Sequence, residues 1–311
     1  MSDNRKRHFI ICLVAVAILA LLPMTAGEFW LYMIRIICIY TILTIGLNIF
    51  MGYCGQINFG ASGFFCMGAY VPTILQMKFG CHYFVAFPAG VALSLFVAWA
   101  VSWPLLRLRS HAMAIGTLAF AMPVYLVFER FEKVTGGSDG TVVHSLSLFG
   151  RIMGPVFYYY LILIFAGLAF LVAYLLVDSR IGMAFKAIRD NEDAAAALGV
   201  NADHYRRLAW LLNALLAAIA GGLYAQQAGF ISPVTFSLAT NVTLLVMLCV
   251  GGSGTILGPV VGAAIMSSVP YLLITIQEYA YLVQGLILFA VLRFLPAGIV
   301  GTIEKRNAGA E

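Results

Sequence analysis

The stretch MGYCGQINFGASGFF, Met51 to Phe65, separates two long apolar segments and decides how the chain is expected to fold. It holds four glycines and three polar side chains, those of Gln56, Asn58 and Ser62. Irregular backbone at membrane depth is tolerated only against protein or a water-filled cavity. If the flanking segments cross a membrane, the stretch is therefore either a tight turn at the cytoplasmic surface or a helix break that lines an inner gate.

The composition places the flanking segments in a membrane. Of the 311 residues, 62% are hydrophobic and only 10% are charged. A soluble domain carries about 25% charged residues, so this chain has too few charges to solvate a globular surface. We expect an all-α, polytopic helical membrane protein, because an open sheet would leave backbone groups unpaired in lipid. The net charge of +5 is spread among loops and does not indicate nucleic-acid binding.

The apolar pattern predicts ten membrane segments within one transmembrane domain, residues 1–311, because about 20 apolar residues cross a bilayer. The segments are 9–25, 29–50, 60–78, 83–106, 112–129, 153–177, 207–228, 236–250, 256–276 and 279–295. The first resembles the apolar core of a signal peptide, but we favour a retained span because no soluble domain follows it. The apolar run between Asn241 and Gly251 is short, so the eighth segment either begins near Phe236 or belongs to a broken helix.

The distribution of basic residues predicts the orientation. With a cytoplasmic N-terminus, 13 of the 18 Lys and Arg residues fall on the cytoplasmic side, four fall outside and Arg35 lies within a span. This agrees with the positive-inside rule and places both termini in the cytoplasm. It also predicts a periplasmic loop at 130–152 and a cytoplasmic loop at 178–206. Arg35 either snorkels outward, which we favour, or pairs within a complex.

The cytoplasmic loop contains the pattern of a short, capped helix. Asn191 suits the N-cap, and Glu192 and Asp193 place negative charge at the positive end of the helix dipole. Four alanines follow, and Gly199 stands where a left-handed cap is expected. The sequence therefore predicts a helix over 192–198, which is either an ordered connector or a docking element for a cytoplasmic partner.

The segment DAAAALG, Asp193 to Gly199, resembles the EAA-type loop of ABC-importer permeases, in which an acid and two alanines precede a glycine at fixed spacing. In that family the loop is the coupling helix, which docks in a groove of the ATP-binding subunit. The resemblance implies coupling to an ATPase through Arg189, Glu192, Asp193, Ala194, Ala195, Leu198 and Gly199.

Six motifs in order resemble the LivM type of high-affinity branched-chain amino-acid permease. They are GLNIFMGYCGQINFGASGFFCMGAY (46–70), TLAFA (117–121), TGGSDG (135–140), SRIGMAFKAIRDNEDAAAALGV (179–200), GFISP (229–233) and FLPAGIVG (294–301). The resemblance implies an ABC-importer permease fold in a bacterial inner membrane, importing leucine, isoleucine or valine. It also implies a LivH-type permease, LivG/LivF-type ATPase subunits and a periplasmic substrate-binding protein as partners. ATP and magnesium would be bound by the ATPases, and no cofactor is expected in this chain.

No enzyme motif is present. The sequence lacks HExxH, no lysine follows the glycine spacing of a P-loop, and the cysteines show no metal-ligand spacing. The predicted span interiors contain no Asp or Glu, which argues against a proton-coupled secondary carrier, although sodium coupling through backbone carbonyls stays open. The alternatives are thus an ion-coupled amino-acid carrier, the same permease type importing urea, amides or other amino acids, or a non-transporting scaffold.

Polar groups inside the predicted membrane region are the candidates for a translocation path. Amides and hydroxyls can exchange hydrogen bonds with a passing zwitterion without holding it tightly. Alternatively, these groups cap helix ends or bond across helices. The TGGSDG motif either meets a binding protein outside or forms a simple turn. The path candidates are Gln56, Asn58, Ser62, Asn241, Gly251, Gly252 and Gly254.

Overall fold

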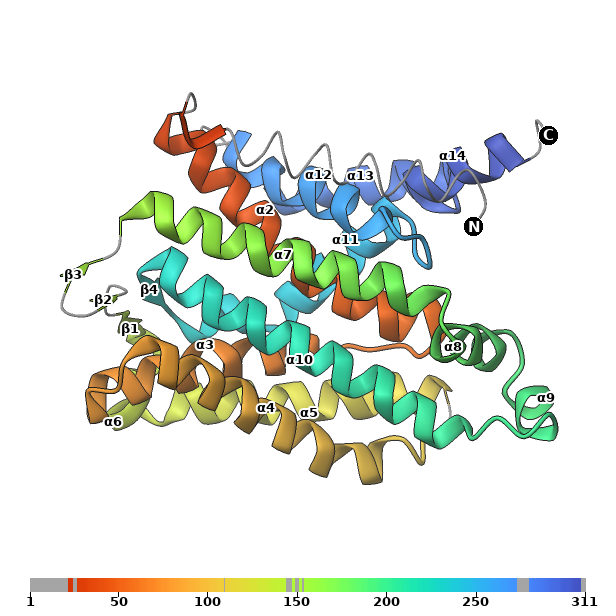
Figure 1. Cartoon of the computed structure of the whole chain (residues 1–311), viewed down its shortest axis with the longest axis horizontal. Coiled ribbons are helices and arrows are strands. Elements are labelled where there is room, and N and C mark those ends of the chain that lie inside the picture. Colours follow the sequence, from red (N-terminus) through yellow and green to blue (C-terminus); the bar gives the residue numbers. More distant parts are fainter. Residues whose placement is uncertain are drawn as a thin grey trace.

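The computed structural model describes residues 22–24, 27–108, 110–143, 147–148, 151–152, 154–272 and 280–308. Its long helices lie side by side in one bundle (Figure 1). The helices are η1 (Leu22–Met24), α2 (Glu28–Leu47), η2 (Asn48–Tyr53), α3 (Ala61–Phe79), α4 (Tyr83–Leu105), α5 (Ser110–Arg130), α6 (Glu132–Thr135), η3 (Gly137–Asp139), α7 (Pro155–Val177), α8 (Arg180–Asp190), α9 (Glu192–Ala197), α10 (Ala202–Ala228), η4 (Pro233–Phe236), α11 (Leu238–Gly251), α12 (Gly258–Leu272), α13 (Ala280–Phe294) and α14 (Gly298–Ala308). The first predicted segment, 9–25, lies almost entirely outside the described residues.

The expected all-α class is confirmed, and the strands described are two residues long. Strand β1 (Thr141–Val142) pairs antiparallel with β4 (Phe230–Ile231), and β2 (Ser147–Leu148) pairs with β3 (Arg151–Ile152). The other nine predicted segments each coincide with a helix. Within the described ranges, however, six helical stretches are long and apolar enough to cross a membrane, and α3, α11 and α12 are not among them. The structure thus supports a polytopic helical membrane protein without fixing the number of crossings at ten.

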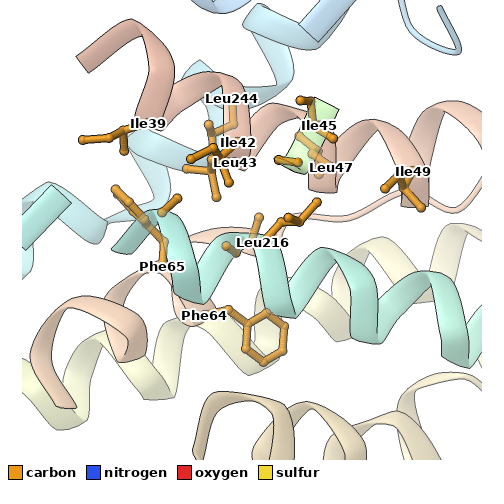
Figure 2. Close-up of a cluster of buried hydrophobic side chains, with 14 of the residues drawn as sticks. Ile39, Ile42, Leu43, Ile45, Leu47, Ile49, Phe64, Phe65, Leu216 and Leu244 are labelled. Atoms are coloured by element: carbon orange, nitrogen blue, oxygen red, sulfur yellow. The ribbon is translucent and has the colours of Figure 1, made fainter. Parts of the chain in front are cut away.

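The core of the bundle lies where α2 meets α3, α10 and α11. Figure 2 shows Ile39, Ile42 and Leu43 of α2 among side chains from the other helices, and all three are fully buried. Two glycines let the backbones of α3 and α10 approach closely. A Cβ atom on Gly68 would overlap the carbonyl oxygen of Ala218, for example. Small residues at such a contact are typical of helix packing in membranes.

Helix α2 does not end in a simple turn. Its last turns become a π-helix, η2, and residues 54–60 then run back into the bundle toward α3 (Figure 1). The backbone N–H of Phe59 donates to Oγ1 of Thr117 (2.9 Å). Thr117 is seven residues into α5, or roughly 10 Å from its start at 1.5 Å per residue. The structure therefore places this stretch inside the bundle, where α3 begins.

The two ends of the bundle differ in character. Helices α8 and α9 lie at one end, and the β1–β4 pair and α6 lie at the other (Figure 1).

Arg35 does not snorkel outward as favoured above: it is buried, donates from Nη1 to the carbonyl of Pro155 (3.2 Å) and lies 3.6 Å from the Glu28 carboxylate. A buried guanidinium needs such partners, because its desolvation is otherwise too unfavourable.

Candidate functional site

The loop at 178–206 folds into two short helices with side-chain caps. Oδ1 of Asn191 accepts a hydrogen bond from the backbone N–H of Ala194 (3.0 Å), so α9 begins where the cap was expected. The helix ends at Ala197, and Gly199 follows with φ +84°, in the left-handed region. The predicted helix over 192–198 is confirmed to within one residue. Asn191 alone separates α9 from α8, so the two helices form one compact unit.

One face of α9 is turned away from the bundle. Among the residues assigned to ATPase coupling, Ala195 is buried, whereas Asp193, Ala194 and Gly199 are exposed. Leu198 is 85% exposed. A large apolar side chain is thus held out into solvent at the tip of a capped helix.

Arg206 anchors α9 to the rest of the protein. Its guanidinium lies 3.0 Å from the carboxylate of Glu192 and 2.7 Å from that of Asp203. Its Nη2 also donates to the carbonyl of Leu106, beyond the end of α4 (3.2 Å). Our sequence reasoning missed this role, because Arg206 counted there only as one positive charge on the cytoplasmic side. The signal available was an arginine fourteen residues after Glu192, which sequence spacing alone does not identify as a partner.

Arg189 behaves differently from the other coupling candidates. It lies on α8, one residue before the helix ends, and its Nη1 donates to the carbonyl oxygen of Gly52. Gly52 belongs to η2, at the start of the helix break. The coupling candidates therefore divide into an outward-facing group on α9 and Arg189, which reaches toward the break.

The segment after η2 is fixed by its own polar side chains. Oδ1 of Asn58 accepts from the backbone N–H of Gly60 (2.6 Å), just before α3 begins. Ser62 and Asn241 bond reciprocally: the backbone N–H of Ser62 donates to Oδ1 of Asn241 (2.9 Å), and Nδ2 of Asn241 donates to Oγ of Ser62 (2.6 Å). For Ser62 and Asn241, the alternative of bonding across helices is thus what the structure shows.

A small cavity adjoins this pair. Its volume is about 10 Å³, which is room for about one water molecule. Ser62, Asn241 and Tyr125 supply its polar lining, and the side chains of α5 and Phe236 close it. The space is therefore far too small for an amino acid in this conformation.

Three buried amides have atoms without a hydrogen-bond partner. These atoms are Oε1 of Gln56, Nδ2 of Asn58, and both Oδ1 and Nδ2 of Asn213. A buried polar group left unpaired is unfavourable by about 1–3 kcal/mol. Asn213 did not enter the sequence-based set, although an amide within the apolar segment 207–228 was a usable signal. Its backbone on α10 packs against Gly46 of α2.

The chain has two glycine-rich interruptions between helices. The first is the stretch 51–65 described above, and the second is the connection between α11 and α12, residues 252–257. Gly251 is the last residue of α11, and Gly252 and Gly254 follow with φ values of +119° and +77°. The backbone N–H of Gly254 donates to Oδ1 of Asn48, the first residue of η2 (2.8 Å), and Arg189 contacts both Gly52 and Gly254. The structure therefore brings the two interruptions together, which their separation in sequence did not predict.

The described residues offer no metal site. No group of three or more His, Cys, Asp or Glu side chains in that part of the chain is placed to hold a metal ion. The polar features of the two interruptions are instead backbone carbonyls, amides and arginines.

Comparison with known proteins agrees with these features. The family described as "Branched-chain amino acid transport system / permease component" matches residues 29–292. The permease LivM of the high-affinity branched-chain amino acid transport system of Escherichia coli K12 is 26% identical over 96% of this chain and 76% of its own length. LivM of Salmonella typhimurium is 25% identical over the same shares of the two chains.

Other permeases are also similar. LivH of Escherichia coli K12 is 26% identical over 85% of this chain and 92% of its own length. The autoinducer 2 import system permease LsrC of Salmonella paratyphi B is 29% identical over 66% of this chain and 59% of its own. No solved structure matches the chain. Since the family match spans most of the sequence and includes both interruptions and the capped helices α8 and α9, the chain belongs to the permease-component family of branched-chain amino acid transport systems.

Proposed function

We propose that this chain is the LivM-type membrane subunit of an ATP-driven importer for leucine, isoleucine and valine. The family assignment and the LivM relatives support the permease role. The proposed partners are a LivH-type permease, two LivG/LivF-type ATPases and a periplasmic binding protein. The ATPases would hold ATP and magnesium, so the chain itself would need no cofactor and would not be an enzyme.

The observation that carries the proposal is the exposed tip of α9. Leu198 is 85% exposed, and Arg206 fixes the helix that presents it. Single exposed apolar residues are common on protein surfaces, so the support comes from the place of Leu198, directly after the capped helix α9 that resembles the coupling helix of ABC-importer permeases. In the proposed complex, Leu198 and the exposed residues around it enter a groove of the ATPase.

The topology follows from the same assignment. The α8–α9 end of the bundle carries Arg180, Lys186, Arg206 and Arg207, so the positive-inside rule supports a cytoplasmic position for this end. We place the chain in the bacterial inner membrane as one domain with about ten membrane segments and with both termini in the cytoplasm. The TGGSDG turn at the opposite end would then face the binding protein.

The proposed translocation path follows the unpaired buried amides. Gln56, Asn58 and Asn213 retain free donors or acceptors, which water or a passing zwitterion could satisfy when the helices separate. Ser62 and Asn241 would open their mutual bonds in that state, and the glycines of the second interruption would supply the flexible backbone. Transport along this path would require the cavity of about 10 Å³ beside Ser62 and Asn241 to widen.

The test is co-purification with the ATPases encoded beside the gene. Leu198→Asp should remove them from the complex, because a carboxylate replaces the apolar tip. Phe79→Asp is the matched control, since Phe79 is also exposed (72%) but ends α3, far from α9. Failure of the unaltered chain to retain an ATPase, or equal retention by both variants, would contradict the proposal. Binding assays on the neighbouring binding protein would separate branched-chain amino acids from urea, amides and other amino acids.

A further inference from the structure

The side chain of Arg189 occupies a space that two glycines leave open. A Cβ atom on Gly55 would lie 2.9 Å from Cγ of Arg189, and one on Gly254 would lie 2.6 Å from its Nη1. Both glycines also have positive φ values, +74° and +77°. The side chain of Arg189 therefore passes between the two interruptions. Any residue other than glycine at 55 or 254 would place a Cβ atom against this side chain and displace it.

Asn48, the first residue of η2, also binds the α11–α12 connection. Its Oδ1 accepts from the backbone N–H of Gly254 (2.8 Å), and its Nδ2 donates to the carbonyl of Thr255 (2.8 Å). The residue is 3% exposed, so water does not compete for these bonds. One buried amide thus satisfies two backbone groups of the α11–α12 connection and fixes it against η2.

The carbonyl of Gly52, which accepts a hydrogen bond from Arg189, lies where a movement of α8 can be passed to η2. Gly52 lies in η2, and π-helical turns are rare and often sit at functional positions. Carbonyls in the last turn of a helix have no partner within that helix, so Gly52 can accept a hydrogen bond from another element. A displacement of α8 would therefore act directly on the end of α2 and, through Asn48, on the start of the α11–α12 connection.

Space for such a displacement adjoins Arg189. A cavity of about 580 Å³ lies between α8, α14 and the α11–α12 connection. Arg189, Ser253, Thr255, Glu304 and Lys305 contribute its polar walls. The arginine can move on this side without entering the packed core.

We propose that Arg189 and Asn48 form a latch that makes the two glycine-rich interruptions move as one unit with α8 and α9. The inference rests on the proposed function, and it gives Arg189 an inward positioning role in place of the ATPase contact that the family resemblance suggests. When the ATPase moves α9, α8 moves with it across the single linking residue. The latch then shifts the end of α2 and the α11–α12 connection together, which opens the cytoplasmic end of the path.

The first experiment measures the latch in the purified chain, without any transport assay. Hydrogen–deuterium exchange is followed for residues 50–57 and 252–257 in Arg189→Gln and in the matched control Arg180→Gln, which alters an exposed cation at the start of the same helix. We expect exchange in both segments to rise about tenfold or more in Arg189→Gln and to stay unchanged in the control. Arg189→Lys should restore part of the protection, because a lysine keeps the charge but not the planar set of donors.

The second experiment uses the assembled importer in proteoliposomes. Arg189→Gln should keep its ATPase subunits and hydrolyse ATP within about twofold of the unaltered complex, while uptake falls at least tenfold. Asn48→Ala should behave in the same way, and the double variant should be no worse than either single variant, as expected for residues that act through one contact network.

Three results would overturn the latch. Exchange that rises only around residues 186–192 would show that Arg189 merely stabilises its own helix. Loss of the ATPase subunits from Arg189→Gln would make it a docking residue, and unchanged uptake would remove its role in transport. If the unaltered chain binds no ATPase, the proposed importer fails, whereas the exchange experiment still decides whether the latch exists.

Discussion

Replacing Arg206 by methionine is expected to loosen the attachment of α9 to the bundle. The guanidinium is 9% exposed and contacts Glu192, Asp203 and the carbonyl of Leu106. Methionine keeps an apolar stem of similar length in the same space but removes every donor. The variant therefore tests the anchor with little change in packing.

The size of the effect follows from those contacts. Of these, only the pair with Glu192 ties α9 to the bundle, because Arg206 and Asp203 both lie on α10 and the bond to the Leu106 carbonyl joins α10 to the end of α4. The Glu192 side chain is 42% exposed, so solvent screens this ion pair. A screened pair contributes only about 0.2–1 kcal/mol. The free energy of opening α9 should fall by about that amount, and since 1.4 kcal/mol is a factor of ten, its amide exchange should accelerate about 1.5- to 5-fold.

Hydrogen–deuterium exchange of residues 192–200 measures this directly. Arg180→Met is the control, because Arg180 is an exposed arginine at the start of α8. In the proposed importer, Arg206→Met should also weaken ATPase retention, since the docking tip is no longer held in place. Unchanged exchange in Arg206→Met, or an equal rise in both variants, would refute the anchoring role.

Three further substitutions test the path, the packing and the cap. Asn213→Leu removes two unpaired buried polar atoms, so it should raise the thermal midpoint in detergent while lowering uptake; unchanged uptake would exclude Asn213 from the path. Gly221→Val places a side chain against the carbonyl of Phe65 and should destabilise the protein by about 1–3 kcal/mol, seen as aggregation in size-exclusion chromatography. At Gly199 a valine side chain would meet no neighbouring atom, but the φ of +84° is unfavourable for valine, so Gly199→Val should destabilise the cap of α9 by about 1–2 kcal/mol. Co-purification of the ATPases should therefore decrease. The control Gly167→Val, at a position with open space on α7, should leave co-purification unchanged.

The features set by local sequence could be predicted. Nine of the ten expected segments coincide with helices. They could be predicted because the length of an apolar run and the glycine or proline residues that end it are local features of the sequence. The short helix at 192–198 was also predictable, since its cap, its alanines and its closing glycine are consecutive residues. These predictions needed no knowledge of which segments touch.

The features that depend on contacts between distant segments could not be predicted. Asn48 and Thr255 are joined by a hydrogen bond across 207 positions, and Arg189 and Gly52 across 137. No periodicity links such residues. The depth at which α3 begins was likewise open, because Gly-rich sequence suits both a surface turn and a break, and only the bond from Phe59 to Thr117 places the stretch inside the bundle.

The most direct test of the central claim is uptake of labelled leucine by proteoliposomes that contain the chain, its LivH-type partner, both ATPases and the binding protein. We predict uptake that requires ATP hydrolysis and that is abolished by Leu198→Asp. Leucine uptake by the chain alone in vesicles without ATP would contradict the account and indicate an ion-coupled carrier.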